Sequence, residues 1–340
     1  MNELKMLFSI SAVIALNGVG TERALAHEPG DFGQYTRGIT IGDPLGATPP
    51  PGLYFENIAL YVPGASGQGQ LGAFKANGLL DAPTFLWSTG YSFLGANLAV
   101  LLSQPFYQAE MWGGSAAGPP YGGVTLYPTV HNTWVSPFTL SWNLGGGLFA
   151  SAGFDFYIPD GSRYVGTMNP DYWTFEPRAS VSYLANGWDL TATFLYNFNL
   201  ASGGRIGPFP GTTASIFGVG YRSGDQAFLD LTASKKFGKW EIGPVAYFAW
   251  QTTSDSLGGG FSCGTMSAVT AEALTCGRAT DYALGAMVGY DFGSVNLTTY
   301  FTDSVYTKDA FGGLSIWTKL SFKLWGPDAP LPLPKGLLTK

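Results

Sequence analysis

Residues Trp188–Leu200 alternate between apolar and polar side chains. One face carries Trp188, Leu190, Ala192, Phe194, Tyr196, Phe198 and Leu200, and the other carries Asp189, Thr191, Thr193, Asn197 and Asn199, with Leu195 as the apolar interruption. Because successive side chains of a strand point to opposite sides, the segment has one apolar and one polar face. It exceeds a typical globular strand of about 5–6 residues and fits a tilted membrane-spanning strand of about 9–11 residues with its ends.

Eleven other segments have the length and composition of strands, and most of them repeat this alternation. The twelve expected strands are Leu53–Val62, Pro83–Ser92, Leu94–Ser103, Val135–Leu144, Gly146–Ile158, Tyr172–Leu184, Trp188–Leu200, Gln226–Lys236, Trp240–Gln251, Asp281–Asp291, Val295–Ser304 and Leu314–Trp325. The pattern predicts an all-β fold, a transmembrane antiparallel β-barrel in which the apolar sets face lipid and the polar sets line the lumen.

The connections between these strands alternate in length, as bacterial barrels with short periplasmic turns and long external loops require. The long connections are Pro63–Ala82, Gln104–Trp134, Pro159–Asp171, Ala201–Asp225, Thr252–Thr280 and Val305–Gly313. Both termini are then periplasmic. Gln70–Leu80 is a possible further strand that needs a partner to keep the count even, so fourteen strands remains the alternative. Ser215–Tyr221 is assigned to an external loop, with or without a short β-extension.

Composition supports a barrel in lipid over a soluble β-protein. Charged residues make up only 12% of the chain while aromatic residues reach 15%, against a usual charged fraction of about 25%. Beyond the N-terminal leader no apolar run reaches the ~18 residues of a spanning helix, and a closed barrel is the other way to satisfy backbone hydrogen bonds in lipid. The net charge of −6 argues against a nucleic-acid partner.

The two ends of the chain have compositions unlike the strands. Residues 1–26 read as a cleaved signal peptide, with Lys5, an apolar core and Ala24-Leu25-Ala26 before the cleavage point. Residues 27–52 form an irregular, Gly- and Pro-rich periplasmic lead-in, and 326–340 a periplasmic tail. Because about eight strands leave room only for side chains and 16–18 make open pores, twelve predict a narrow or plugged lumen. Phe32, Tyr35 and Ile39 of the lead-in are candidates to enter it.

Charged residues in the lumen phase are the candidate site. They are Asp155, Glu176, Arg178, Asp189, Asp230, Glu241, Lys319 and Lys323. One interpretation is that they form mutually compensating pairs that keep the interior hydrated and rigid. The other is that some of them line a constriction and select solutes.

Three further features of the sequence bear on possible chemistry. Cys263 and Cys276 lie in one expected external loop, where a structural disulfide is predicted in an oxidising compartment. His131 followed by Asn132 is compatible with a Ser-His-Asn lipase, although no motif supplies the serine or an oxyanion donor. No His/Cys cluster has metal-ligand spacing. We therefore expect neither catalysis nor a metal or other cofactor.

Several motifs together resemble an outer-membrane family named for the meta-pathway of phenol degradation, whose members are described as transporters. They are Pro51-Gly52-Leu53-Tyr54, Ser136-Pro137-Phe138-Thr139-Leu140-Ser141-Trp142, Phe156-Tyr157-Ile158-Pro159-Asp160-Gly161-Ser162-Arg163-Tyr164, Asn169 with Trp173-Thr174-Phe175-Glu176-Pro177, Tyr221-Arg222-Ser223-Gly224 before Asp230, and Gln251 with Asp255. Asp160 stands where Thr is common in that family. The resemblance covers Gly52 to Trp325 and implies passage of small hydrophobic or aromatic compounds.

The expected protein is an outer-membrane channel for passive uptake of such compounds. Its expected partners are outer-membrane lipid, the solutes themselves and the barrel-assembly machinery during biogenesis. The alternatives are a structural or adhesive barrel without a solute pathway, a lipid-acting barrel enzyme, and a secreted soluble β-protein.

Overall fold

The structure is a computed structural model that describes residues 33–67, 74–113, 121–162, 170, 172–200, 221–254, 256–257 and 278–327. The expected signal peptide, most of the expected tail, and Cys263 and Cys276 lie outside these ranges. Within them, no helix is long and apolar enough to cross a membrane.

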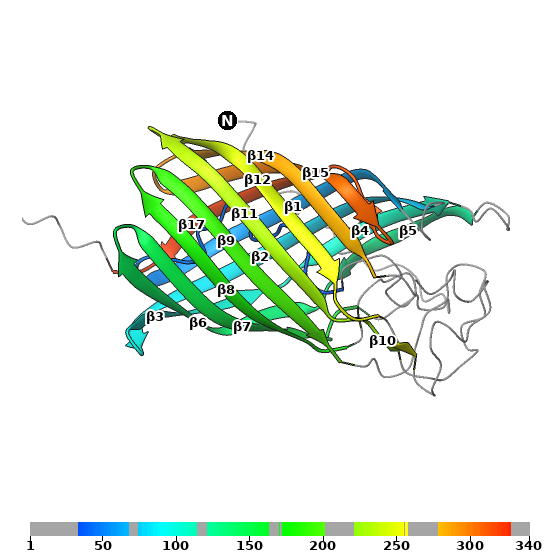
Figure 1. Cartoon of the computed structure of the whole chain (residues 1–340), viewed down its shortest axis with the longest axis horizontal. Helices are drawn as coiled ribbons and strands as arrows, with labels where there is room; N and C mark the ends of the chain where they lie inside the picture. Colours follow the sequence, from blue (N-terminus) through cyan, green and yellow to red (C-terminus); the bar gives the residue numbers. More distant parts are fainter. Residues whose placement is uncertain are drawn as a thin grey trace, which may run out of the picture.

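Twelve strands close into an antiparallel barrel (Figure 1). They are β1 (Gly52–Gly67), β2 (Phe74–Phe93), β3 (Ala96–Ser103), β6 (Thr133–Gly145), β7 (Leu148–Ile158), β8 (Thr174–Ala185), β9 (Trp188–Asn199), β11 (Gln226–Phe237), β12 (Trp240–Gln251), β14 (Thr280–Asp291), β15 (Val295–Lys308) and β17 (Ser315–Trp325). The ring closes because β1 pairs with β17 on one side and with β2 on the other.

Each of the twelve predicted strands is confirmed, and the fourteen-strand alternative is wrong. Residues Phe74–Leu80, which suggested an additional strand, are the first part of the 20-residue strand β2. β1 and β2 both continue into the predicted loop Pro63–Ala82, and they pair as far as Ser66 and Lys75. The loop is therefore much shorter than the sequence pattern suggested.

The prediction that Gln104–Trp134 is one loop is also wrong, because it contains a β-hairpin. β4 (Phe106–Gly113) pairs with β5 (Tyr121–Val130) and with the first part of β2. β3 pairs with the later part of β2, so β3 and β4 lie end to end along it. The hairpin extends one side of the barrel wall well beyond its rim (Figure 1).

Three short strands complete the described sheets. β10 (Tyr221–Arg222) pairs with β13 (Ser256–Leu257), and β16 (Phe311–Gly312) pairs with the end of β1. At the opposite end of the barrel the strands are joined by tight turns. In one of them Asn186 and Gly187 both have positive φ, at 53° and 76°, which is the backbone of the two-residue hairpin turns that favour Asn-Gly.

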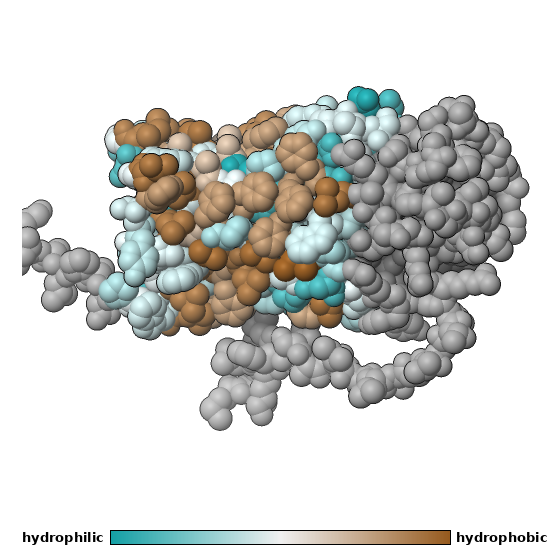
Figure 2. Space-filling model, turned by 90° about the horizontal axis from the view of Figure 1, so that it is seen from below, coloured by the Kyte–Doolittle hydropathy of each residue, from teal (hydrophilic) through white to brown (hydrophobic). Residues whose placement is uncertain are grey.

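The side of the barrel drawn in Figure 2 carries a broad band of apolar side chains. On β9, Phe194 and Phe198 are 43% and 48% exposed, whereas Thr193 and Asn197 on the other face are 1% and 0% exposed. Trp188 and Trp240 are exposed at the ends of their strands, where aromatic girdles of membrane barrels lie. The alternation found in the sequence is thus the lipid-facing and lumen-facing alternation of the barrel.

Candidate functional site: the lumen and the segment inside it

The inner wall of the barrel has a polar side and an apolar side. On β7, β8, β9 and β11 the buried side chains are mainly polar, including Ser151, Asp155, Glu176, Arg178, Ser180, Ser182, Thr191, Thr193, Asn197, Asp230 and Thr232. On β1, β12, β14, β15 and β17 the buried set includes Ile58, Leu60, Val245, Tyr247, Met287, Tyr300 and Trp317. The expectation of a polar lumen is therefore correct for the first group of strands and only partly correct for the second, where Gln251, Asp281, Thr302 and Lys319 are buried among the apolar side chains.

Residues 33–50 lie inside the barrel and reach from one end of the lumen to the other. Gln34 donates to the backbone oxygen of Tyr172 at 3.1 Å, at the end with the long connections. The backbone oxygen of Pro49 accepts from the Ser88 hydroxyl at 2.8 Å, toward the end with the tight turns. Between these points the backbone folds through successive turns, such as Ile39 N to Thr36 O at 3.0 Å. We call residues 33–50 the lumen segment.

The lumen segment presents apolar side chains to the apolar side of the wall. Ile39 and Ile41 are 5% and 0% exposed and join the same buried cluster as Tyr247, Met287 and Trp317. At this side the Tyr300 hydroxyl donates to the Gly38 backbone oxygen at 2.9 Å. The aliphatic residues thus have the same role inside the barrel that core residues have in a soluble domain.

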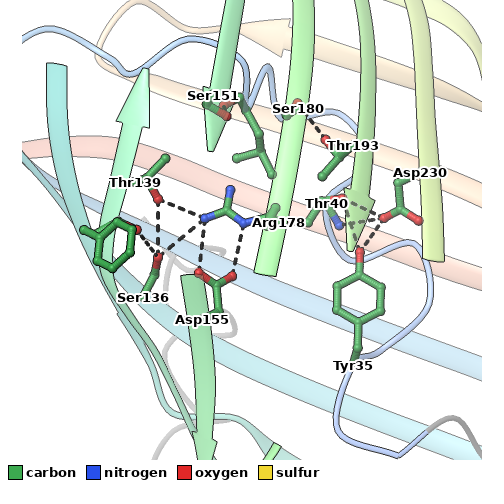
Figure 3. Close-up of polar contacts among 12 residues, drawn as sticks. Tyr35, Thr40, Ser136, Thr139, Ser151, Asp155, Arg178, Ser180, Thr193 and Asp230 are labelled. Atoms are coloured by element: carbon green, nitrogen blue, oxygen red, sulfur yellow. Dashed lines mark hydrogen bonds and ion pairs between the residues drawn. The ribbon is translucent and has the colours of Figure 1, made fainter. Parts of the chain in front are cut away.

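On the polar side, Asp230 of β11 is the main anchor of the lumen segment. Its Oδ2 accepts from the Tyr35 hydroxyl at 2.6 Å, from the Thr40 hydroxyl at 2.7 Å and from the Thr40 backbone N–H at 3.2 Å. Figure 3 shows Tyr35 and Thr40 of the lumen segment converging on this carboxylate. Three donors on one oxygen hold this part of the segment in a single position.

Two ion pairs also join the lumen segment to the wall. Lys319 of β17 pairs with Asp43, and Arg37 pairs with Asp281 of β14. Arg37 also donates to the Phe311 backbone oxygen at 2.9 Å. These pairs place two basic groups next to acidic partners inside the barrel, where each unpaired charge would be costly.

Two glycines let the lumen segment approach the wall closely. A Cβ at Gly46 would lie 2.5 Å from the Ser182 backbone nitrogen, and the Gly46 N–H donates to the Ser182 hydroxyl at 3.0 Å. Gly38 has φ of +84°, and a Cβ there would lie 3.1 Å from the Tyr247 ring. Only glycine fits both positions without moving the backbone.

A second network lies in the wall itself, around Arg178. Its Nε is 3.1 Å from Asp155 Oδ2, one Nη is 3.4 Å from Asp155 Oδ1, and the same Nη donates to the Thr139 hydroxyl at 3.0 Å. Arg178 and Asp155 are 6% and 0% exposed. In Figure 3 the guanidinium forks between Asp155 and the hydroxyls of β6.

The eight predicted lumen residues divide by what they contact. Asp155 with Arg178 form a pair within the wall, and Asp230 and Lys319 bind the lumen segment. Asp189 is buried and accepts from the Thr191 hydroxyl at 2.6 Å. Glu241 is half-buried near the tight turns, with Ser234 and the exposed Lys236 as partners. Lys323 lies exposed at the end of β17 and donates to Pro327.

Glu176 differs from the other seven. It is 0% exposed, and none of the described residues donates a hydrogen bond to either carboxylate oxygen within normal geometry. It lies opposite Asp155 in the β7–β8 register, with Arg178 and the Tyr157 hydroxyl as electrostatic neighbours. Asn197 of β9 and Gln226 of β11 are cross-strand partners, and the amide atoms of both also lack a partner among the described residues.

Sequence reasoning missed several residues that hold the lumen segment. Arg37 and Asp43 were not selected because the lead-in has no periodic pattern. Asp281, at the start of its strand, was not selected either. One feature of the sequence does indicate a filled lumen. It is an apolar residue on an otherwise polar strand face, such as Leu195, which is 0% exposed.

His131 and Asn132 do not form the arrangement a lipase triad would need. The Asn132 side chain, which would have to orient the histidine, donates to Gln34 at 3.1 Å and to the Pro170 backbone oxygen at 2.6 Å. Its Oδ1 accepts from Gly161 N–H at 2.9 Å. Asn132 therefore binds the lumen segment to the wall. Among the described residues, no group of three or more His, Cys, Asp or Glu side chains is placed to hold a metal ion.

A closed twelve-stranded antiparallel barrel with an apolar outer band and an interior filled by its own chain defines a β-barrel of the outer-membrane type. The chain belongs to the family described as "Putative MetA-pathway of phenol degradation", whose model matches residues 62–320. No curated protein matches the chain.

Solved structures resemble this fold to different degrees. The COG4313 outer membrane channel from Pseudomonas putida F1 superposes with a TM-score of 0.61 at 10% identity, covering 83% of this chain and 98% of that one. The translocator domain of the autotransporter NalP from Neisseria meningitidis gives 0.47 at 13% identity, covering 84% and 92%. A TodX mutant monoaromatic hydrocarbon channel gives 0.40 at 9% identity, covering 90% and 97%. The first of these similarities is strong enough to show a shared fold.

Proposed function

We propose that the protein is a passive channel of the bacterial outer membrane for small hydrophobic or aromatic compounds, and that the lumen segment is its plug. The observation that carries this proposal is the composition of the filled lumen. An aqueous porin has a polar interior, whereas one side of this lumen is lined by buried aromatic and aliphatic residues such as Tyr247, Tyr300 and Trp317. Such a surface suits an apolar solute better than a hydrated one.

The family supports the same solute class, since its description refers to phenol degradation. The P. putida relative is named as an outer membrane channel. The outer-membrane location is supported by the apolar band of the barrel and by the sequence of the leader, which predicts export. Outer-membrane lipid and small aromatic solutes are accordingly the proposed partners.

The first experiment tests the plug. Deleting residues 31–47 should raise the rate at which proteoliposomes swell in arabinose, because the polar side of the lumen would then face an open path. A less invasive variant is Asp43→Lys, which places two basic groups together at the Lys319 site and should also increase swelling. Adding Lys319→Asp should restore the pair and close the lumen again.

The second experiment tests the solute. Cells that express the protein should take up radiolabelled toluene or phenol faster than cells without it at low external concentration. Equal uptake by both strains would favour a structural or adhesive barrel over a channel.

The plug experiment has its own contradicting outcome. Swelling that is unchanged by the deletion and by Asp43→Lys, with correct barrel assembly by gel mobility, would show that the lumen segment is not the barrier.

A further inference from the structure

We propose that Phe228 and Asp230 of β11 form a binding site for a phenolic ring, which Tyr35 of the lumen segment occupies in this structure. A phenolic solute would take the place of the Tyr35 side chain and thereby weaken the attachment of the lumen segment. This proposal rests on the proposed channel function and specifies which aromatic compounds the lumen recognises.

The first support is the way the wall holds the Tyr35 side chain, which is itself a phenol. Its ring lies 4.6 Å from the Phe228 ring, centroid to centroid, with the planes tilted by 46°. Its hydroxyl donates to Asp230 Oδ2 at 2.6 Å, within the range of about 2.5–2.7 Å for a hydroxyl that donates to a carboxylate. Tyr35, Phe228 and Asp230 are 1%, 1% and 3% exposed.

The second support is that the two wall residues are positioned independently of Tyr35. Phe228 and Asp230 are two residues apart on one strand, so both side chains point into the lumen. β11 is paired along both edges, with Phe228 opposite Leu195 of β9 and Ala249 of β12. A ring contact and a carboxylate acceptor are therefore fixed by the barrel, while the Tyr35 ring and the Thr40 donors come from the lumen segment.

The third support is the unused hydrogen-bonding capacity around the ring. Asp230 Oδ1 has no partner among the described residues, and neither do the amide atoms of Gln226, four residues earlier on the same face. Buried polar groups are normally paired. Tyr35 uses only one carboxylate oxygen, whereas a solute ring with a second hydroxyl could also donate to Asp230 Oδ1. The site is thus suited to hydroxylated aromatic rings more than to plain hydrocarbons.

The chemistry predicts a measurable preference. A hydrogen bond to a charged acceptor distinguishes a ligand with a hydroxyl from one without it by about ten-fold or more in affinity. In the native chain the solute competes with the Tyr35 ring, which the chain holds near the site at an effective concentration in the mM range. Removing the Tyr35 side chain should therefore tighten phenol binding about ten-fold or more.

The test uses the purified full chain in detergent, with phenol and toluene as probes of nearly equal size. Tyr35→Ala should bind phenol more tightly than the native protein does, measured by calorimetry and by the rise in unfolding temperature. The ratio of phenol to toluene affinity should fall about ten-fold when Asp230→Asn is added to Tyr35→Ala. Comparing ratios removes the difference in hydrophobicity between the two probes.

Tyr300→Ala is the matched control. Tyr300 is also a 1% exposed lumen tyrosine, but its hydroxyl donates to the neutral Gly38 carbonyl and its ring stacks on Trp317 at 5.6 Å. A cavity there should accept either probe without a preference that depends on Asp230. If phenol stabilises Tyr300→Ala and Tyr35→Ala equally, the effect is general cavity filling and the proposal is wrong.

A milder variant covers the case in which Tyr35→Ala does not fold. Tyr35→Phe keeps the ring and loses only the hydroxyl, so cellular uptake of radiolabelled phenol should rise severalfold, while Tyr290→Phe, on the outer face of β14 against Trp240, should leave it unchanged. Uptake equal to that of the native protein in Tyr35→Phe would overturn the proposal. Absence of any protein-dependent uptake would instead contradict the channel function, and the binding measurements in detergent would still decide whether the site exists.

Discussion

Replacing Arg178 with Met should destabilise the barrel strongly, because it removes one partner of a buried ion pair. The guanidinium is 6% exposed and contacts Asp155 through Nε at 3.1 Å and Nη at 3.4 Å. Without it, Asp155 would remain buried as an uncompensated charge beside Glu176. Breaking such a pair costs about 3–5 kcal/mol, which is roughly two to four powers of ten in the ratio of folded to unfolded protein.

Reversible urea unfolding in the presence of lipid vesicles, followed by tryptophan fluorescence, would measure this change. Asp155→Leu combined with Arg178→Met replaces the pair by apolar side chains of similar size, so the double variant should recover most of the lost stability. The matched control is Lys236→Met, since Lys236 is 62% exposed and only 3.6 Å from Glu241. Exposed pairs contribute about 0–1 kcal/mol.

Two results would contradict this prediction. A cost for Arg178→Met no larger than that for Lys236→Met would mean that water reaches this part of the lumen and screens the charges. A double variant as unstable as the single one would mean that the hydrogen bond from Arg178 to Thr139, and not the ion pair, holds the wall together.

Three further predictions concern the lumen segment and the charges of the lumen wall. Gly46→Ala should raise swelling rates in arabinose, because the new methyl group pushes the lumen segment off Ser182. The strands stay paired, so the free energy of unfolding should fall by no more than about 1–3 kcal/mol. Unchanged swelling would mean that the segment has room to shift. In proteoliposomes containing the chain without residues 31–47, reversal potentials in a KCl gradient should show cation preference, weakened by Glu176→Gln. Lys319→Gln should strengthen the preference for cations. Shifts of the reversal potential that are equal in sign and size in the two variants would exclude a direct electrostatic effect.

The twelve strands were predictable because the signal for each is local. Membrane and lumen impose opposite requirements on adjacent side chains, so the alternation is readable within one strand, as at Trp188–Leu200. The β4–β5 hairpin lies beyond the region where lipid imposes this pattern, and Gly122, Gly123 and Pro128 interrupt it there. Its pairing with β2 depends on the register of a neighbouring strand and not on its own sequence.

The partners of the charged residues were predictable only within the wall. Asp155 and Arg178 lie on adjacent strands, and the interpretation of compensating pairs is correct for them. Lys319 and Asp43, by contrast, are separated by 276 residues in the sequence, and Tyr35 and Asp230 are separated by 195. No periodicity in either segment indicates these contacts, because they form only when an irregular segment folds inside a completed barrel.

The apolar residues on lumen-facing positions do, however, carry information about that segment. In a barrel filled with water, a large apolar side chain pointing inward would be exposed at a cost of about 25 cal/mol per Å² of its surface. Leu195 and Phe228 both point inward and are 0% and 1% exposed, so protein atoms must cover them. A polar face that is interrupted by such residues on several strands therefore predicts an occupied lumen, and the irregular segment that precedes the first strand is the part of this chain positioned to fill it.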